Sequence, residues 1–353
     1  MLKILNLSFI ALLSLLVVDL TAQIPLKRVQ EIGNQFPIAT EIAIAVIQNG
    51  EITYHGFVKM KEGYKAKKNH QAVFEIGSIS KVFTATILAH KVYNGKLELE
   101  MPVKKLLQHK LKGNPKISLL TLANHTSGLP RLPENLLSLI QKDPYNPYKN
   151  YDAAKLKDYC KTMLHVDHVP GTTYAYSNLG AGLLGHALAV KSKQSYETLL
   201  QTLVFQPFDM ASTTTNRALV NDRLVKGLSP IGVEVPNWDL NVLAPAGGIL
   251  SSVEDLAKFA QANFNTAHQF LTLQRQVTHT IDEQSSIALG WHISDKQYHW
   301  HNGATGGYRS FMTLNVASKT AVIVLSNLGP AHPKSGNIDV LAMKWMKDLH
   351  KKN

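Results

Sequence analysis

The chain has 353 residues, a formal net charge of +12 at pH 7 and a single cysteine, Cys160. One cysteine excludes an intramolecular disulfide, and this length is enough for one large core or two closely packed domains. A basic surface can suit nucleic acid, but the lysines are scattered along the chain rather than gathered in a stripe. We therefore expect no nucleic-acid partner.

Residues 1–22 have the pattern of a secretory signal peptide. Lys3 gives a positive start, residues 4–18 are mostly apolar, and Ala22 places a small residue at the cleavage site. An uncleaved anchor is the alternative, but the apolar run is short for a bilayer span, which needs about 20 residues. No cysteine follows it to carry a lipid. We expect a periplasmic or secreted protein with no stable membrane anchor after cleavage.

The predicted elements begin with a short helix over residues 29–34. An apolar strand at 41–47 turns at Asn49-Gly50 into a strand at 52–59, because Asn-Gly between apolar runs is a strong hairpin signal. A helix over 82–92 ends at Asn94-Gly95. The middle of the chain is punctuated by prolines and has helical patterns at 118–124, 152–164, 180–191 and 196–205.

The last third of the chain changes from helical to strand-like patterns. An amphipathic helix at 253–263 is followed by strand patterns at 289–294, 298–301, 309–315 and 320–327, and by a helix at 339–350. Strands near both ends predict an α/β (α+β) fold, an antiparallel β-sheet sandwiched by helices with an inserted all-α domain. The expected domains are a sandwich, residues 23–96 and 243–353, and a helical domain, residues 97–242.

The chain contains one Ser-x-x-Lys motif, Ser78–Lys81, at the start of a predicted helix. Residues three apart share a helix face, so the Lys81 amine would stand beside the Ser78 hydroxyl and could take its proton. Backbone N–H groups at the first turn would attract an anion. The alternative for an isolated match is a capped helix with an exposed lysine.

Two further motifs follow in order, Tyr176–Asn178 and His301–Gly303. With Ser78–Lys81 they make the chain similar to the serine β-lactamase and penicillin-binding protein superfamily, specifically its class C branch. That branch also holds D,D-peptidases, D-aminopeptidases and carboxylesterases. Residues 94–97, 125–130 and 245–252 match as well, so the resemblance covers nearly the whole mature chain. It implies a three-layer sandwich with a cleft at the domain boundary.

The resemblance implies an acyl-enzyme mechanism without a metal or cofactor. Ser78 would attack the carbonyl, while Lys81 and Tyr176 hold and move its proton. A crowded cationic site is expected to favour both the Tyr176 phenolate and the neutral amine. Deacylation would reuse this pair, because no Glu-x-x-Leu-Asn loop of the class A type is visible.

The resemblance also assigns substrate contacts. Asn178 would hydrogen-bond both Lys81 and a substrate amide, and the segment from His301 onward would be an edge strand that pairs with the substrate. The N–H groups of Ser78 and Ala304 would form the oxyanion hole. The predicted substrate-binding residues are Asn178, His301, Asn302, Gly303 and Ala304.

Two positions depart from the class C pattern. Class C enzymes typically begin the third motif with lysine, whereas this chain has His301, which would supply a positive charge only when protonated. A glutamine that contacts the substrate amide usually follows Gly-Leu-Pro, whereas this chain has Arg131. Histidine pairs with metal-ligand spacing occur at 165/168 and 299/301, but no cysteine or carboxylate cluster accompanies them.

We therefore expect an exported, class C β-lactamase-like serine hydrolase, a monomer that opens β-lactam amides through an acyl-enzyme on Ser78. The alternatives are a D-amino-acid peptidase, a D,D-carboxypeptidase or a carboxylesterase acting on small D-peptides or esters. A third possibility is a penicillin-binding sensor that is acylated and stays acylated.

Overall fold

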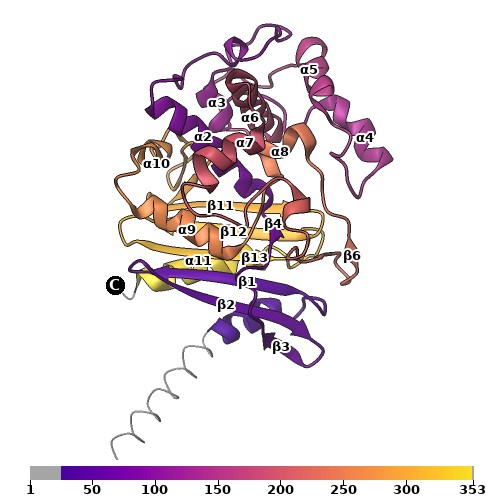
Figure 1. Cartoon of the computed structure of the whole chain (residues 1–353), viewed down its shortest axis with the longest axis vertical. Helices are drawn as coiled ribbons and strands as arrows, with labels where there is room; N and C mark the ends of the chain where they lie inside the picture. Colours follow the sequence, from indigo (N-terminus) through magenta and orange to yellow (C-terminus); the bar gives the residue numbers. More distant parts are fainter. Residues whose placement is uncertain (1–24, 352–353) are drawn as a thin grey trace, which may run out of the picture.

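The computed structural model describes residues 25–351, so the predicted signal peptide, residues 1–22, lies outside the described residues. The described chain forms a nine-stranded antiparallel sheet in the order β3-β2-β1-β13-β12-β11-β10-β9-β8 (Figure 1). N-terminal and C-terminal strands meet where β1 (Glu41–Gln48) pairs with β13 (Thr320–Ser326). The fold class and the building of the sheet from both ends are confirmed.

The other strands of this sheet follow the predicted pattern with three additions. They are β2 (Glu51–Met60), β3 (Gly63–Ala66), β8 (His279–Thr280), β9 (Ser285–Ile287), β10 (His292–Ser294), β11 (Tyr298–Thr305) and β12 (Tyr308–Asn315). The short strands β3, β8 and β9 were not predicted, because two to four residues are too few to show a periodic pattern. The strand predicted at 289–294 begins later, since Gly290 has a φ of +72° and turns the chain.

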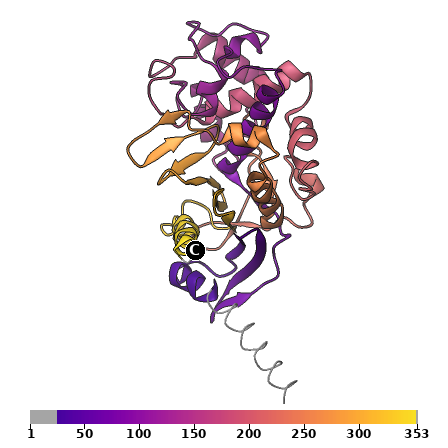
Figure 2. The ribbon, with the colours of Figure 1, turned by 90° about the vertical axis from the view of Figure 1, so that its left-hand side faces the viewer.

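Helices cover both faces of the sheet because alternate residues of a strand face opposite sides. On β1, Ala45 packs with α2 (Ser80–Tyr93) and α9 (Val253–Phe264). Its neighbour Ile44 packs on the other face with α11 (Asn337–His350). The helix over residues 25–33 lies on the same side as α11, opposite α9 (Figure 2).

Most of the remaining helices gather above the sheet in Figure 1. They are α3 (Leu119–Ala123), α4 (Leu137–Lys142), α5 (Ala153–Thr162), α6 (Asn178–Ser192), α7 (Tyr196–Leu200), α8 (Ala244–Gly247) and α10 (Gln269–Gln274). All four helical patterns predicted between residues 97 and 242 are present, and α7 continues into a π-helical turn, Gln201–Phe205. The division into a sandwich domain and a helical domain stays a prediction.

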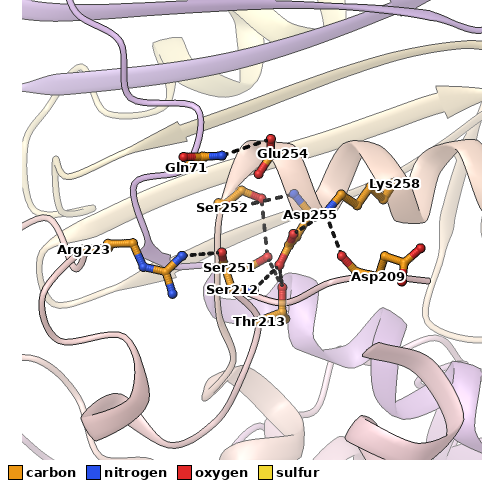
Figure 3. Close-up of polar contacts among 10 residues, drawn as sticks. All are labelled: Gln71, Asp209, Ser212, Thr213, Arg223, Ser251, Ser252, Glu254, Asp255 and Lys258. Atoms are coloured by element: carbon orange, nitrogen blue, oxygen red, sulfur yellow. Dashed lines mark hydrogen bonds and ion pairs between the residues drawn. The ribbon is translucent and has the colours of Figure 1, made fainter. Parts of the chain in front are cut away.

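The buried carboxylate of Asp255 attaches α9 to the loop that holds Ser212 and Thr213 (Figure 3). Asp255 is 1% exposed and accepts hydrogen bonds from the Ser212 N–H at 2.7 Å and the Thr213 hydroxyl at 2.8 Å. Lys258 lies 3.3 Å from the same carboxylate. Ser252 caps the helix by accepting the Asp255 N–H. These bonds fix the start of α9 to the loop that holds Ser212 and Thr213.

Two further features bear on earlier expectations. Across residues 25–351, no helix combines the length and apolar character that crossing a bilayer demands. Cys160 is buried in the larger core, and burial raises the pKa of its thiol to about 12. It is a packed, unreactive thiol.

Candidate active site

Ser78 lies in a single 3-10 turn, Gly77–Ile79, that leads directly into α2. Gly77 has a φ of +50°, and a Cβ there would lie 2.5 Å from the Ala304 nitrogen of β11. Only glycine therefore lets the turn approach β11 this closely. Ser78 stands just before the helix, beside the strand that carries the third motif.

Lys81 follows Ser78 onto the same face, as its spacing predicts. Its Nζ donates to the Ser78 Oγ at 3.0 Å and to the Ala246 carbonyl at 2.6 Å. The side chain is 2% exposed, and burial together with the Arg131 charge holds the pKa of Lys81 well below its usual value. The amine can therefore lose its proton and accept the one from Ser78.

The expected hydrogen bond between Lys81 and Asn178 is wrong, because α8 places the Ala246 carbonyl within reach of the lysine instead. The Asn178 Oδ1 is buried and has no partner among residues 25–351. Asn178 lines the same small cavity as Ser78, so its amide oxygen is available to a substrate N–H.

Tyr176 joins this pair, but its phenol is not acidic. Burial raises the pKa of Tyr176, and the neighbouring Ser78 hydroxyl and the Arg131 charge oppose that rise only in part. Lys81 Nζ lies 4.8 Å and Arg131 Cζ 5.1 Å from the ring centroid. The expectation of a favoured phenolate is wrong, because loss of hydration outweighs the Ser78 hydrogen bond and the Arg131 charge.

His301 is fully buried and does not present a charge to the cleft. Its Nδ1–H donates to the Asn302 carbonyl at 2.6 Å, and its Nε2 has no partner in the described part of the chain. Burial, followed by the neighbouring His292 and Lys81, lowers the pKa of His301 well below 6.5. The neutral ring is therefore strongly favoured, and His301 does not supply the positive charge that it would carry if protonated.

The third motif forms an open edge of the sheet. β12 pairs with β11 from His299 to Thr305, but β10 reaches only as far as Trp300 on the other side. The segment from His301 onward thus has one neighbouring strand among the described residues, as predicted for an edge. Its pairing with a substrate stays a prediction.

The side chains of the third motif have different roles. Asn302 donates to Asp339 of α11 at 2.8 Å, so its side chain points away from the cleft and only its backbone can face a substrate. A Cβ on Gly303 would lie 2.0 Å from the Ile76 carbonyl, so glycine is required for β11 to pack on the segment before Ser78. Ala304 lines the cavity beside Ser78.

Two aromatic residues that the sequence analysis missed complete the cavity. Tyr148 and Trp238 line it opposite Ser78, with ring centroids 5.3 Å apart, and its volume is about 30 Å³. Glu75 fixes this wall by accepting the Trp238 N–H at 3.0 Å and the Asn237 side chain at 2.7 Å. Neither aromatic residue lies in a recognisable motif.

Two histidines lie near Tyr176 without having been predicted to do so, the buried His125 and the half-buried His292. The His125 ring centroid lies 4.4 Å from that of Tyr176, and its Nδ1 accepts the Ser177 N–H. His292 Nε2 lies 2.7 Å from the Tyr174 hydroxyl. Within residues 25–351, no three His, Cys, Asp or Glu side chains are placed to hold a metal ion.

The Beta-lactamase family model matches residues 36–342. The chain belongs to this family, within the serine β-lactamase and penicillin-binding protein superfamily. It is 31% identical over 290 residues to a Beta-lactamase of Pseudomonas fluorescens, covering 78% of this chain and 74% of that protein. It is 26% identical over 313 residues to Protein flp of Staphylococcus aureus, covering 81% of this chain but only 59% of that relative's length.

Solved members of the superfamily have the same fold. A penicillin-binding protein homologue from Pyrococcus abyssi, described as octameric, superposes with a TM-score of 0.77 at 24% identity, covering 96% of this chain and 78% of that one. A class C beta lactamase from Rhodobacter sphaeroides superposes with a TM-score of 0.74 at 20% identity, covering 92% and 98%. The family assignment makes this chain a serine hydrolase-like protein; its substrate is a separate question.

Proposed function

We propose that this protein is an exported serine hydrolase that opens β-lactam amides through an acyl-enzyme on Ser78. The observation that carries the proposal is the 3.0 Å contact between the Lys81 amine and the Ser78 hydroxyl, in surroundings that lower the pKa of the lysine. A buried neutral amine beside a hydroxyl is the arrangement that activates a serine nucleophile.

Acylation would proceed in two steps. Ser78 Oγ bonds to the carbonyl carbon as its proton passes to Lys81 Nζ, and the negative oxygen is held by the N–H groups of Ser78 and Ala304. The carbon–nitrogen bond then breaks, the leaving nitrogen takes the proton of the Tyr176 phenol, and the proton on Lys81 passes to Tyr176, which restores the neutral amine and the phenol. Tyr176 suits this second role because its phenol keeps its proton near neutral pH.

Deacylation needs a water molecule and a base. Lys81 is the base that the site offers, because its amine contacts Ser78 Oγ and burial keeps the proton on the Tyr176 phenol. Water would add to the ester carbonyl and give a proton to the Lys81 amine, and Lys81 would return that proton to Ser78 Oγ as the ester bond to Ser78 breaks. The same lysine thus serves both halves of the reaction.

The second candidate is a D-amino-acid peptidase, D,D-carboxypeptidase or carboxylesterase of the same superfamily. The buried, neutral His301 favours it, because the class C lysine at this position is a permanent cation and this ring is not. A relative of known structure is described as a Beta-lactamase/D-Alanine Carboxypeptidase from Pseudomonas syringae. A penicillin-binding sensor remains the third candidate.

The decisive experiment compares three acyl donors on the purified protein: a chromogenic cephalosporin, a D-Ala-D-Ala peptide and a p-nitrophenyl ester. Intact-mass spectrometry follows the adduct during turnover. A transient adduct with rapid cephalosporin hydrolysis supports the lactamase, while a lasting penicillin adduct supports the sensor. Failure of Ser78→Ala to lose both adduct and turnover would overturn the covalent mechanism.

Export and oligomeric state need separate measurements. N-terminal sequencing of the protein from a periplasmic fraction should begin at Gln23 if the signal peptide is cleaved after Ala22. Light scattering coupled to size exclusion tests the expected monomer.

A further inference from the structure

Arg131 carries a positive charge beside a site in which His301 is neutral. It follows Pro130, and its carbonyl accepts the N–H groups of Asn178 at 3.0 Å and Leu179 at 3.2 Å. These bonds attach its backbone to the start of α6, next to Tyr176. Its side chain is exposed, with Cζ 5.1 Å from the Tyr176 ring centroid. The guanidinium therefore lies at the rim of the Ser78 cleft on a fixed backbone.

The charge of Arg131 reaches the groups around the nucleophile. It lowers the pKa of Lys81, though less than burial does, and opposes the rise that burial causes in the pKa of Tyr148. Tyr148 lines the cavity that Ser78 opens into. Because the guanidinium lies 5.1 Å from the Tyr176 ring centroid and Tyr148 shares the cavity of Ser78, the cation stands close to the space that a substrate would occupy.

Arg131 also differs from the other arginines of the chain. Within residues 25–351, each of the other five guanidinium groups donates a hydrogen bond to another side chain; these are Arg28, Arg217, Arg223, Arg275 and Arg309. Arg131 makes no side-chain hydrogen bond or ion pair with any described residue. Its guanidinium N–H groups therefore have no side-chain partner among the described residues and are available at the rim of the cleft.

We propose that Arg131 recognises a carboxylate of the substrate and is the anion-binding residue of this site. The guanidinium is a permanent cation whose planar donors match a carboxylate in a two-bond arrangement. His301 cannot take this role, because it is buried and neutral. The inference rests on the proposed function and narrows the substrate class to acyl donors that carry a negative charge near the scissile bond.

Binding without turnover tests the proposal independently of the reaction. On the Ser78→Ala protein, calorimetry measures Kd for benzylpenicillin and its methyl ester, and for a p-nitrophenyl glutarate monoester and the p-nitrophenyl valerate ester. The first pair differs by a charge on the leaving-group side, and the second by a charge on the acyl side. Arg131 should give a preference for the acid in at least one pair.

Removing the guanidinium should erase that preference. Arg131→Gln should weaken binding of the preferred acid about ten- to a hundredfold, the usual value of a charge-assisted contact, and change the matched ester less than about threefold. Arg131→Lys should retain part of the effect, because it keeps the charge and loses the planar fork. Lys142→Gln, which removes an exposed charge from α4, is the matched control and should leave both ligands unchanged.

Two outcomes would overturn the proposal. One is a Ser78→Ala protein that binds acid and ester equally in both pairs. The other is an Arg131→Gln variant that weakens acid and ester by the same factor, which would make Arg131 a structural cover for Tyr176. A wild-type protein that binds anions through Arg131 but hydrolyses no β-lactam would refute the proposed activity alone.

Discussion

Lys81 Nζ lies 3.0 Å from Ser78 Oγ, across the junction between a 3-10 turn and the first turn of α2. The contact requires the 3-10 turn, because Gly77 holds the chain against β11 before the helix begins. Lys81 can act as a base only because it is buried, since an exposed lysine would keep its proton.

Replacing Lys81 by arginine should abolish acylation. Arginine keeps the charge but does not lose its proton at any working pH, so kcat/KM should fall by about a hundredfold to ten-thousandfold. Stopped-flow or intact-mass measurement of acyl-enzyme formation gives the rate. Lys96→Arg, at an exposed lysine beyond the same helix, is the control, and an Lys81→Arg protein within tenfold of wild type would refute the role of the amine as base.

The pH dependence of acylation should follow the same group. The base must be neutral, so kcat/KM should be low in acid and rise with pH until the pH exceeds the lowered pKa of Lys81. The rise should end well below pH 10.5, the usual lysine value. A profile that is flat from pH 5 to 10 on a neutral ester would contradict this assignment.

The buried histidines should make the protein sensitive to acid. His125 and His301 have folded-state pKa values well below 6.5, through burial and nearby cations. Below pH 6.5 the unfolded chain therefore binds more protons than the folded one. The stability that these two neutral histidines contribute is fully present above that pH and is lost as the pH falls. At pH 5 each histidine should cost about 2 kcal/mol of unfolding free energy.

Urea unfolding at pH 7.5 and pH 5 measures this loss. His301→Gln should reduce the pH-dependent part of the change in unfolding free energy by about 2 kcal/mol, whatever its effect at neutral pH. An exposed histidine, His168, is the control, since its replacement by glutamine removes no buried ring. Equal pH dependence in wild type and His301→Gln would show that His301 is already charged in the folded protein.

Restoring the class C lysine at position 301 should not improve activity. The His301 ring packs beside His292 and Tyr176, with centroids 5.1 and 6.2 Å away. A lysine would bring a second amine into a buried region that already holds Lys81, and an unpaired buried charge is costly. His301→Lys should lower Tm by several degrees relative to His301→Gln, and improved penicillin turnover in a stable His301→Lys protein would contradict this account.

Asp255 should matter for stability and not for chemistry. Asp255→Asn replaces a buried carboxylate that accepts hydrogen bonds from the Ser212 N–H and the Thr213 hydroxyl and pairs with Lys258 (Figure 3). The variant should lose about 1–3 kcal/mol of unfolding free energy, with kcat/KM unchanged at a temperature where it is folded. Glu254→Gln, one position earlier on α9, is the matched control and should lose less than about 0.5 kcal/mol.

The sequence alone determined the elements that depend on local pattern. The Asn49-Gly50 hairpin, the helices of the middle region and the strands at both ends follow from periodicity and turn residues that act over a few positions. The Ser78–Lys81 spacing determined the nucleophile and its neighbour for the same reason, since residues three apart meet on one helical face. Short strands such as Ser285–Ile287 could not be predicted, because three residues are too few to show a periodic pattern.

Only the tertiary structure decided the electrostatics of the site. A pKa depends on how many atoms exclude water and which charges lie near, and those neighbours come from distant segments. The sequence placed a histidine at position 301, but β10, α2 and the loop before α6 bury it and keep it neutral. The same packing leaves the guanidinium of Arg131 exposed beside Tyr176, with no side-chain partner among residues 25–351, so a cation outside the three motifs lies next to the site.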